Sequence, residues 1–267
     1  MNQSDKRELA EAAYFDQSPL KAAQRYAAST EWKAILCFLP VQAGLALDVG
    51  AGNGIASHAL AQAGWRVTAI EPDPSGLVGA GAILAIAADT GLPIEVKNNY
   101  GESIDVPDSS FDLVFARQVL HHAQSLPRLC DELYRVLRSG GRLITVRDHV
   151  ISRKEDLQAF LDIHPLHNLY GGENAFLRQE YQACLTGAGF TIRKTLAPLL
   201  SPINYSPMTR EGMRSELCRR LGKIPGAGSV GRLALRNDMA LDAALRLVTW
   251  IDRRPGRLYS FVCDKPL

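Results

Sequence analysis

Three glycines stand at alternate positions in "LDVGAGNG", which covers residues 47–54. Gly50, Gly52 and Gly54 follow an apolar run that has Asp48 near its end. A backbone without side chains lets a ligand approach the main chain closely. A phosphate group and a nucleoside without phosphate are both candidate ligands for such a loop, and they imply different enzymes.

The glycine spacing departs from the dinucleotide-binding fingerprint G-x-G-x-x-G, in which the pyrophosphate lies on a helix N-terminus. Gly50 and Gly52 fit the first two positions, but Ile55 occupies the third, and the third glycine comes one residue early at Gly54. The spacing therefore disfavours a pyrophosphate ligand. A glycine-rich turn without any ligand is the simplest alternative, because such turns between a strand and a helix are common.

Three histidines form a second set of residues that could do chemistry. His121, His122 and His149 follow or end two runs that we expect to be strands. Histidine titrates near neutral pH, so each of them is a candidate general base that removes a proton from an acceptor. A histidine that only packs against its neighbours is the alternative for any single one of the three.

The stretch "HPLHNLYGGENAF" adds further polar residues. His164, His167 and Glu173, together with His149, are residue types that bind metal ions. A proline and two paired glycines predict a loop there, however, and the sequence has no HExxH motif. We therefore expect no metal, and we predict that His164, His167 and Asn168 contact a polar acceptor.

Alternating strand and helix patterns indicate the elements that position these residues. Short apolar runs are typical of strands buried on both faces, and helical spacing between them predicts a doubly wound, mostly parallel α/β sheet with helices on both faces. The expected strands are 45–50, 65–72, 94–100, 111–117, 142–150, 190–197 and 256–263, and the expected helices are 55–64, 76–91, 126–141 (stopped by Gly140) and 176–190.

Polar residues gather where these strands end. In a parallel sheet the ligand lies beyond the carboxyl ends of the strands. Asp48, Glu71, 100–103, 118–122 and 148–149 all fall at such ends. Their clustering across five expected strands predicts one shared site.

Composition excludes several classes of protein. The 267 residues carry a formal net charge of +2, which gives no support to nucleic acid or a membrane surface as a partner. No apolar run reaches the roughly 18 residues of a membrane span, and the polar start predicts no signal peptide. The five cysteines lie far apart without a CxxC pair, which is typical of reduced thiols in a cytoplasmic protein.

Four motifs in order resemble the class I S-adenosylmethionine-dependent methyltransferases, in the small-molecule, type 11-like branch. They are "LDVGAGNG", Glu71 in "VTAIEPD", "ESIDVPDSSFDLVFARQVLHH" and "LCDELYRVLRSGGRLI". The resemblance covers about residues 45–197. It implies a Rossmann-like sheet of seven strands with an antiparallel last strand, and S-adenosyl-L-methionine as the cofactor, released as S-adenosyl-L-homocysteine.

The resemblance also implies roles for residues. The glycine loop would approach the methionine and ribose portions, Glu71 would accept both ribose hydroxyls, and Arg117 and Gln118 would lie beside the methionine tail. Glu71 as a solvated acid at a strand end is the alternative. The residues expected to bind the cofactor are Asp48, Gly50, Ala51, Gly52, Asn53, Gly54, Glu71, Pro72, Gly101, Glu102, Ser103, Arg117 and Gln118.

The adenine contacts depart from the family's pattern. Tyr100 stands where this family often has an aspartate. Either Glu102 substitutes for that aspartate, or backbone amides and stacking hold the adenine.

Transfer of an activated sulfonium methyl is an in-line displacement, so the protein mainly has to align the acceptor. Where the acceptor carries a proton, His122, His149 or His121 would be the base. The histidine pair recurs in the family's loop after the fourth strand, and we expect one of the two to pack structurally.

Four segments make up the expected organisation. Residues 1–40 form a helical segment that closes over the cofactor with Tyr14, 41–197 and 256–267 form the methyltransferase core, and 198–255 form a helical cap over the acceptor. Tyr14 as a mere packing anchor is the alternative. The many arginines of the cap suggest an anionic small-molecule acceptor, with a solvated, charge-balanced helix surface as the alternative. The residues do not indicate the oligomeric state.

Two rival functions stay open. A nicotinamide-dependent oxidoreductase has the same type of fold, but Ile55 and the absence of a YxxxK-type pair disfavour it. An inactive S-adenosylmethionine-binding partner protein is the other rival, because class I methylation requires no invariant catalytic side chain.

Overall fold

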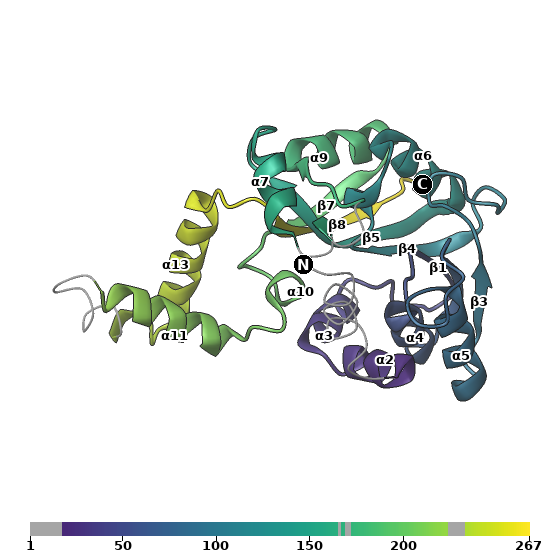
Figure 1. The fold of residues 1–267 in the computed structure, drawn as a ribbon, viewed down its shortest axis with the longest axis horizontal. Helices are drawn as coiled ribbons and strands as arrows, with labels where there is room; N and C mark the ends of the chain where they lie inside the picture. The colour runs from purple at the N-terminus through teal and green to yellow at the C-terminus, as the bar shows by residue number, and fades with distance from the viewer. Residues whose placement is uncertain (1–17, 165–166, 169–171, 224–232) are drawn as a thin grey trace.

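The computed structural model describes residues 18–164, 167–168, 172–223 and 233–267. Its centre is a sheet in the order β3-β2-β1-β4-β5-β8-β7, with the short β6 paired to β5 (Figure 1). The strands are β1 (Leu45–Val49), β2 (Arg66–Ile70), β3 (Ile94–Lys97), β4 (Phe111–Arg117), β5 (Leu137–Ile151), β6 (Phe176–Leu177), β7 (Thr191–Leu196) and β8 (Arg257–Asp264).

Strand directions confirm the predicted fold class. Strands β1 to β5 run parallel, whereas β8 is antiparallel to both of its neighbours, β5 and β7. The seven predicted strands are all present, and the two-residue β6 is an addition to them.

Helices cover both faces of the sheet (Figure 1). On one face lie α2 (Pro19–Ala27), α3 (Thr30–Leu36), α4 (Ile55–Gln62) and α5 (Ala80–Thr90), and on the other lie α6 (Leu126–Val136) and α9 (Arg178–Gly187). Residues 1–17, and with them Tyr14, lie outside the described residues, so the predicted closing role of Tyr14 stays a prediction.

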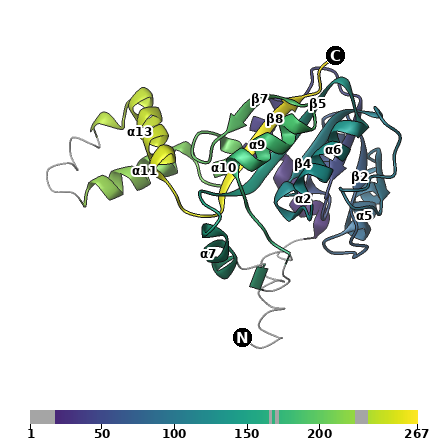
Figure 2. The ribbon, with the colours of Figure 1, turned by 90° about the horizontal axis from the view of Figure 1, so that it is seen from above.

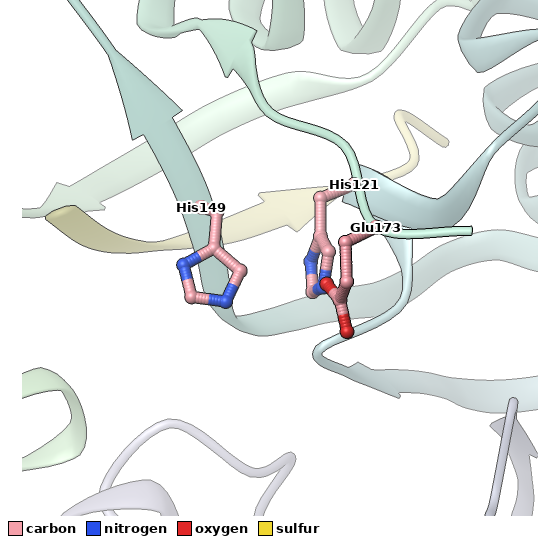
Figure 3. A group of neighbouring side chains, drawn as sticks. All are labelled: His121, His149 and Glu173. Carbon is pink, nitrogen blue, oxygen red and sulfur yellow. The ribbon is translucent and has the colours of Figure 1, made fainter. Parts of the chain in front are cut away.

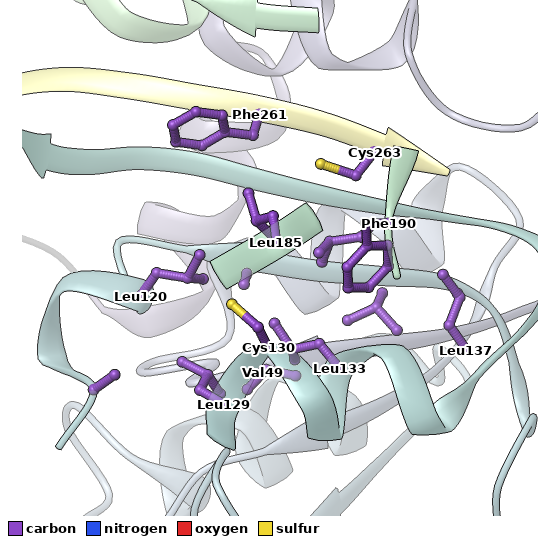
Figure 4. Close-up of a cluster of buried hydrophobic side chains, with 14 of the residues drawn as sticks. Val49, Leu120, Leu129, Cys130, Leu133, Leu137, Leu185, Phe190, Phe261 and Cys263 are labelled. Atoms are coloured by element: carbon purple, nitrogen blue, oxygen red, sulfur yellow. The ribbon is translucent and has the colours of Figure 1, made fainter. Parts of the chain in front are cut away.

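Helix α6 shows how the apolar pattern builds the core. Pro127 stands in its first turn, where no intrahelical N–H is needed. Leu126, Leu129 and Leu133 share one face and are buried against the sheet and α9 (Figure 4). Each fully buried leucine contributes about 1.5–3 kcal/mol to folding. This layer anchors the carboxyl ends of β4 and β5.

The end of α6 corrects one prediction. The helix stops at Val136 and not at Gly140, and β5 already begins at Leu137. The Gly140 amide donates to the Lys265 carbonyl at 2.9 Å, and the Lys265 amide donates to the Gly141 carbonyl at 2.9 Å. Pairing with the C-terminal segment after β8 therefore holds this stretch in the first part of β5, where Gly140 has a φ of 75°.

The described residues of the segment before β8 include helices, and the predicted role of this segment as an acceptor cap stays a prediction. It contains α10 (Pro202–Tyr205), α11 (Arg210–Leu221) and α13 (Asp238–Ile251), while α7 (Asp156–Ile163) precedes β6. Helices α11 and α13 stand away from the sheet in both views and share a small cluster around Met213 and Leu241 (Figures 1 and 2). None of the helices in the described ranges has the length and apolar character that a membrane span requires.

The arginines of this segment pair with acids of the same segment. Arg210 lies 2.7 Å from Asp242, and Arg219 and Arg220 each lie 2.7 Å from Glu216. These pairs are largely exposed to solvent. The arrangement fits the charge-balanced surface better than a site for an anionic acceptor.

Candidate active site

The glycine loop after β1 has an unusual backbone. Gly50, Gly52 and Gly54 have φ angles of 61°, 55° and 82°, a region that other residues rarely adopt. A Cβ on Gly50 would lie 2.7 Å from Val119 Cγ2, and one on Gly54 would lie 3.1 Å from Ile83 Cγ1. A Cβ on Gly52 would meet nothing closer than 3.9 Å. Gly50 and Gly54 are thus required by packing, whereas Gly52 borders open space where a ligand can approach.

Glu71 fastens this loop to the end of β2. Its Oε2 accepts a hydrogen bond from the Gly52 amide at 2.7 Å, and its Oε1 accepts one from the Asp73 amide at 3.0 Å. Burial raises the pKa of Glu71, and the two amide hydrogen bonds oppose that rise. The solvated alternative for Glu71 does not hold, because the residue is only 8% exposed.

Asp48 is a buried carboxylate beside the same loop. Its Oδ2 accepts a hydrogen bond from the Ser57 hydroxyl at 2.6 Å, and the residue is 1% exposed. Burial raises the pKa of Asp48 to about 7, although the Ser57 hydrogen bond lowers it. A carboxylate that is so hard to ionise favours a ligand that brings a cation or hydrogen-bond donors.

We expect Asp48 to make the ligand-free protein less stable as the pH rises from about 4 to about 7. The unfolded chain loses this proton near its ordinary pKa, and the folded chain loses it near pH 7. The folded state therefore binds more protons between these values, and its advantage is lost as the pH rises. Asp48→Asn removes this titration, and one unit of pKa corresponds to about 1.4 kcal/mol.

Urea denaturation of both proteins at about pH 4.5 and about pH 8 checks this expectation. The free energy of unfolding of Asp48→Asn, measured relative to wild type, should be higher at about pH 8 than at about pH 4.5 by at least about 1.4 kcal/mol. A difference between the proteins that does not change with pH would contradict the assignment.

Arg117, at the end of β4, faces helix α3. Its Nε donates to Glu31 Oε1 at 2.7 Å and its Nη1 donates to Gln118 Oε1 at 2.7 Å. Arg147 Nη1 donates to Glu31 Oε2 at 3.1 Å. Burial lowers the pKa of Arg117, but the bonds to Glu31 outweigh it and raise the pKa. The Arg117 guanidinium is thus held by other groups of the protein. Contact between the methionine tail and the backbone at Arg117 and Gln118 stays a prediction.

Glu31 is a residue of this region that the sequence analysis missed. It is 4% exposed and lies between two arginines. Its partners are 86 and 116 residues away along the chain, so no local pattern signals the contact.

The segment after β3 is held by its own contacts. Tyr100 is 71% exposed. A Cβ on Gly101 would lie 2.9 Å from Leu129 Cδ1, so the chain passes tightly over α6 here. Glu102 Oε1 accepts from the Ser125 amide at 2.9 Å, before the start of α6. Glu102 therefore has a protein partner, and the adenine role of Gly101, Glu102 and Ser103 stays a prediction.

Histidines from three segments meet near the carboxyl ends of β4 and β5, and Figure 3 shows two of them, His121 and His149. His121 Nδ1 lies 3.1 Å from Asp148 Oδ1, and His121 Nε2 lies 3.5 Å from Glu173 Oε2. The rings of His121 and His149 are 4.6 Å apart, and His164 Nδ1 lies 3.8 Å from Glu173 Oε1. The structure thus brings His164, which the sequence predicts to contact the acceptor, together with two of the candidate bases, His121 and His149.

The histidines differ in exposure and in pKa. The His121 side chain is 2% exposed and that of His122 is 45% exposed. Burial lowers the pKa of His149 to about 4, helped by the neighbouring His121. Burial also lowers the pKa of His122. Burial opposes the charged form of His121 as well, but the neighbouring Asp148 and Glu173 outweigh it and raise the pKa of His121.

Two further residues that the sequence predicts to contact the acceptor, His167 and Asn168, lie on the segment after α7. Asn168 is exposed, and its Nδ2 donates to the Asp162 carbonyl at 3.1 Å. His167 is half-buried on the same segment. Their contact with an acceptor stays a prediction.

Comparison with known proteins finds one matching family. Residues 47–145 match the family described as "Methyltransferase domain". This part of the chain is therefore similar to a methyltransferase domain. The matched residues contain the glycine loop, Glu71 and His121, whereas His149 and Glu173 of the histidine cluster lie outside the match.

Individual curated relatives of this chain are also named as methyltransferases. It is 31% identical to the ubiquinone biosynthesis O-methyltransferase of Methylobacterium nodulans (strain LMG 21967 / CNCM I-2342 / ORS 2060), over 39% of this chain and 40% of that protein. It is 37% identical to an uncharacterized methyltransferase of Mycobacterium avium (strain 104), over 36% of each chain. The matches span about two fifths of the length of these curated relatives.

A solved structure shares the fold. The geranyl diphosphate C-methyltransferase from Streptomyces coelicolor A3(2), in complex with Mg²⁺, geranyl diphosphate and S-adenosyl-L-homocysteine, superposes with a TM-score of 0.60. The two are 14% identical, and the match covers 88% of this chain and 78% of that one.

Proposed function

We propose that the protein transfers the methyl group of S-adenosylmethionine to a polar small molecule. The observation that carries the proposal is the glycine loop, in which Gly52 borders open space and its amide donates to the buried Glu71 at 2.7 Å. This combination supports a nucleoside with an amino-acid tail rather than a pyrophosphate, because Ile55 replaces the third glycine of the dinucleotide fingerprint.

The chain's own residues fit the cofactor. Glu71 would accept the ribose hydroxyls with the carboxylate lone pairs that the two amides leave free. Asp48 would attract the ammonium of the methionine tail, which relieves the cost of its burial. The bound cofactor supplies a methyl group already activated on sulfur, and the protein has to align the acceptor with it.

The acceptor would lie beyond β4 and β5, where the histidine cluster provides polar groups. The name of the Methylobacterium nodulans relative, an O-methyltransferase, supports an oxygen acceptor. A hydroxyl acceptor has to lose a proton, and His121, His122 or His149 would take it. Among these three, His122 has the most open ring. An anionic acceptor has less support, because several of the cap's arginines, Arg210, Arg219 and Arg220 among them, are paired with acids of the cap.

The cellular setting follows from the thiols. All five cysteines are free, and they lie far apart. This supports a reducing compartment, and we place the protein in the cytoplasm. Neither the charge nor the site supports nucleic acid as a partner.

Thermal denaturation with two ligands separates this function from the oxidoreductase rival. A ligand at 100 times its Kd stabilises the native state by about 2.7 kcal/mol, which raises Tm by about 5–10 °C in a protein of this size. We expect that rise with S-adenosylhomocysteine and none with NAD. The reverse result would overturn the proposal.

Turnover separates the proposal from the inactive binding protein. Release of S-adenosylhomocysteine in a screen of hydroxyl, amine and carboxylate acceptors would support an enzyme. Stabilisation by S-adenosylhomocysteine with no turnover in the whole screen would favour the inactive alternative.

A further inference from the structure

Two imidazoles and one carboxylate converge beside the proposed acceptor position. One ligand atom from each of His121, His149 and Glu173 lies within 4.8 Å of the other two (Figure 3). We propose that these three residues bind a divalent transition-metal ion. From the sequence alone we expect no metal here. His121 is also not among the residues that the sequence points to as possible ligands.

The hydrogen bonds behind the two histidines support this assignment. His121 Nδ1 lies 3.1 Å from the Asp148 carboxylate, and His149 Nδ1 lies 3.2 Å from the Gly256 carbonyl. An acceptor on Nδ1 fixes the tautomer that carries its proton there and leaves the lone pair on Nε2. This pairing of a ring nitrogen with a carboxylate or a carbonyl is what metal-binding histidines almost always show.

The carboxylate of Glu173 also lacks a proper partner. Its side chain is 6% exposed, and Oε2 has no hydrogen-bond partner among the described residues. The 3.5 Å between Oε2 and His121 Nε2 is too long for a good hydrogen bond. It is close to the separation of about 3.3 Å that two ligands have on a tetrahedral ion with bonds of about 2.0 Å.

Neighbouring contacts hold the cluster in place. The Phe160 ring lies 4.9 Å from His149 and 5.1 Å from His164, which packs the outer side of the site. His122 Nδ1 lies 3.1 Å from the Gly172 carbonyl and so ties down the segment that carries Glu173. The most distant ligand atom has to move in by up to about 1.5 Å to complete a tetrahedral set, which side-chain rotation can provide.

The donor set selects the class of metal. Two imidazole nitrogens and one carboxylate oxygen suit Zn²⁺, Fe²⁺ or Co²⁺, whereas Mg²⁺ prefers oxygen ligands only. Three protein ligands leave a position open, as in catalytic rather than structural sites. With the proposed function, that position would bind an acceptor oxygen and lower the pKa of its hydroxyl. Metal binding itself does not rest on the proposed function.

Titration of the full-length protein with Co²⁺, after removal of metals by chelation and dialysis, tests the site. We expect one equivalent of Co²⁺ to give a visible d–d absorption band, Zn²⁺ to abolish it by competition, and Mg²⁺ to leave it unchanged. His121→Asn keeps a donor for Asp148 and removes only the Nε2 ligand. His121→Asn and Glu173→Gln should each weaken Co²⁺ binding by more than about 100-fold.

His122→Asn is the matched control, because asparagine keeps a side-chain donor for the Gly172 carbonyl and the imidazole that it removes is not one of the three ligands. It should bind Co²⁺ within about threefold of wild type. Glu173→Gln keeps the test decisive if the buried His121→Asn variant does not fold, and thermal denaturation without metal identifies that case.

The absence of a one-equivalent band, or equal Co²⁺ affinity in wild type, His121→Asn and Glu173→Gln, would overturn the proposal. The cluster would then hold a shared proton between Asp148, His121 and Glu173. Binding of S-adenosylhomocysteine, measured on the same samples, reports on the proposed function separately, so the two proposals can fail independently.

Discussion

Glu71→Ala is expected to weaken the binding of S-adenosylhomocysteine by at least about 100-fold. The carboxylate would lose its hydrogen bonds to the ribose hydroxyls, and a hydrogen bond to a charged group contributes about 1.5–3 kcal/mol. A loss of about 2.7 kcal/mol already corresponds to a factor of 100 in Kd. The loop adds to this loss, because Glu71 also holds the Gly52 amide at 2.7 Å.

Isothermal titration calorimetry measures this effect directly. Glu95→Ala is the matched control, since Glu95 is an exposed carboxylate on the neighbouring strand β3. It should leave the affinity unchanged. Glu71→Gln keeps one oxygen acceptor for the loop and should lie between Glu71→Ala and wild type. Unchanged affinity in a folded Glu71→Ala protein would remove Glu71 from the cofactor site.

The parts of this fold that the sequence predicts are those set by short-range patterns. The apolar runs of β1 and β4 and the glycine loop between β1 and α4 carry their signals within a few residues. The boundary between α6 and β5 could not be placed in this way. Gly140 pairs with Lys265, 125 residues further along, and that contact decides the local conformation.

The site shows the same division. The residues of the glycine loop are neighbours in the chain, so their spacing predicts a turn whose backbone a ligand can approach. The histidine cluster depends on a bulge in β5, where the register with β8 shifts between Thr145 and Asp148 and Arg147 has a φ of 63°. A bulge redirects the side chains that follow it. Nothing in the sequence locates that bulge, so the contact between Asp148 and His121 could not be predicted.

Glu31→Ala is expected to lower the free energy of unfolding by about 3–5 kcal/mol, because it leaves a buried arginine charge without its partner. Arg117 would lose both hydrogen bonds to Glu31, at 2.7 Å and 3.2 Å. Arg147 would retain the Ser206 carbonyl at 2.6 Å, so Arg117 should account for most of the loss. Urea denaturation measures the free energy, and Tm should fall by about 10 °C.

Glu216→Ala supplies the comparison. Glu216 also lies between two arginines, Arg219 and Arg220, at 2.7 Å each, but this pairing is exposed on α11. Its loss should leave the unfolding transition unchanged, since solvent screens exposed pairs. Equal effects of the two substitutions would mean that the burial of Glu31 has no energetic consequence. A large effect of Glu31→Ala alone would show that the charge between α3, β4 and β5 fastens the N-terminal helices to the strands that carry the active site.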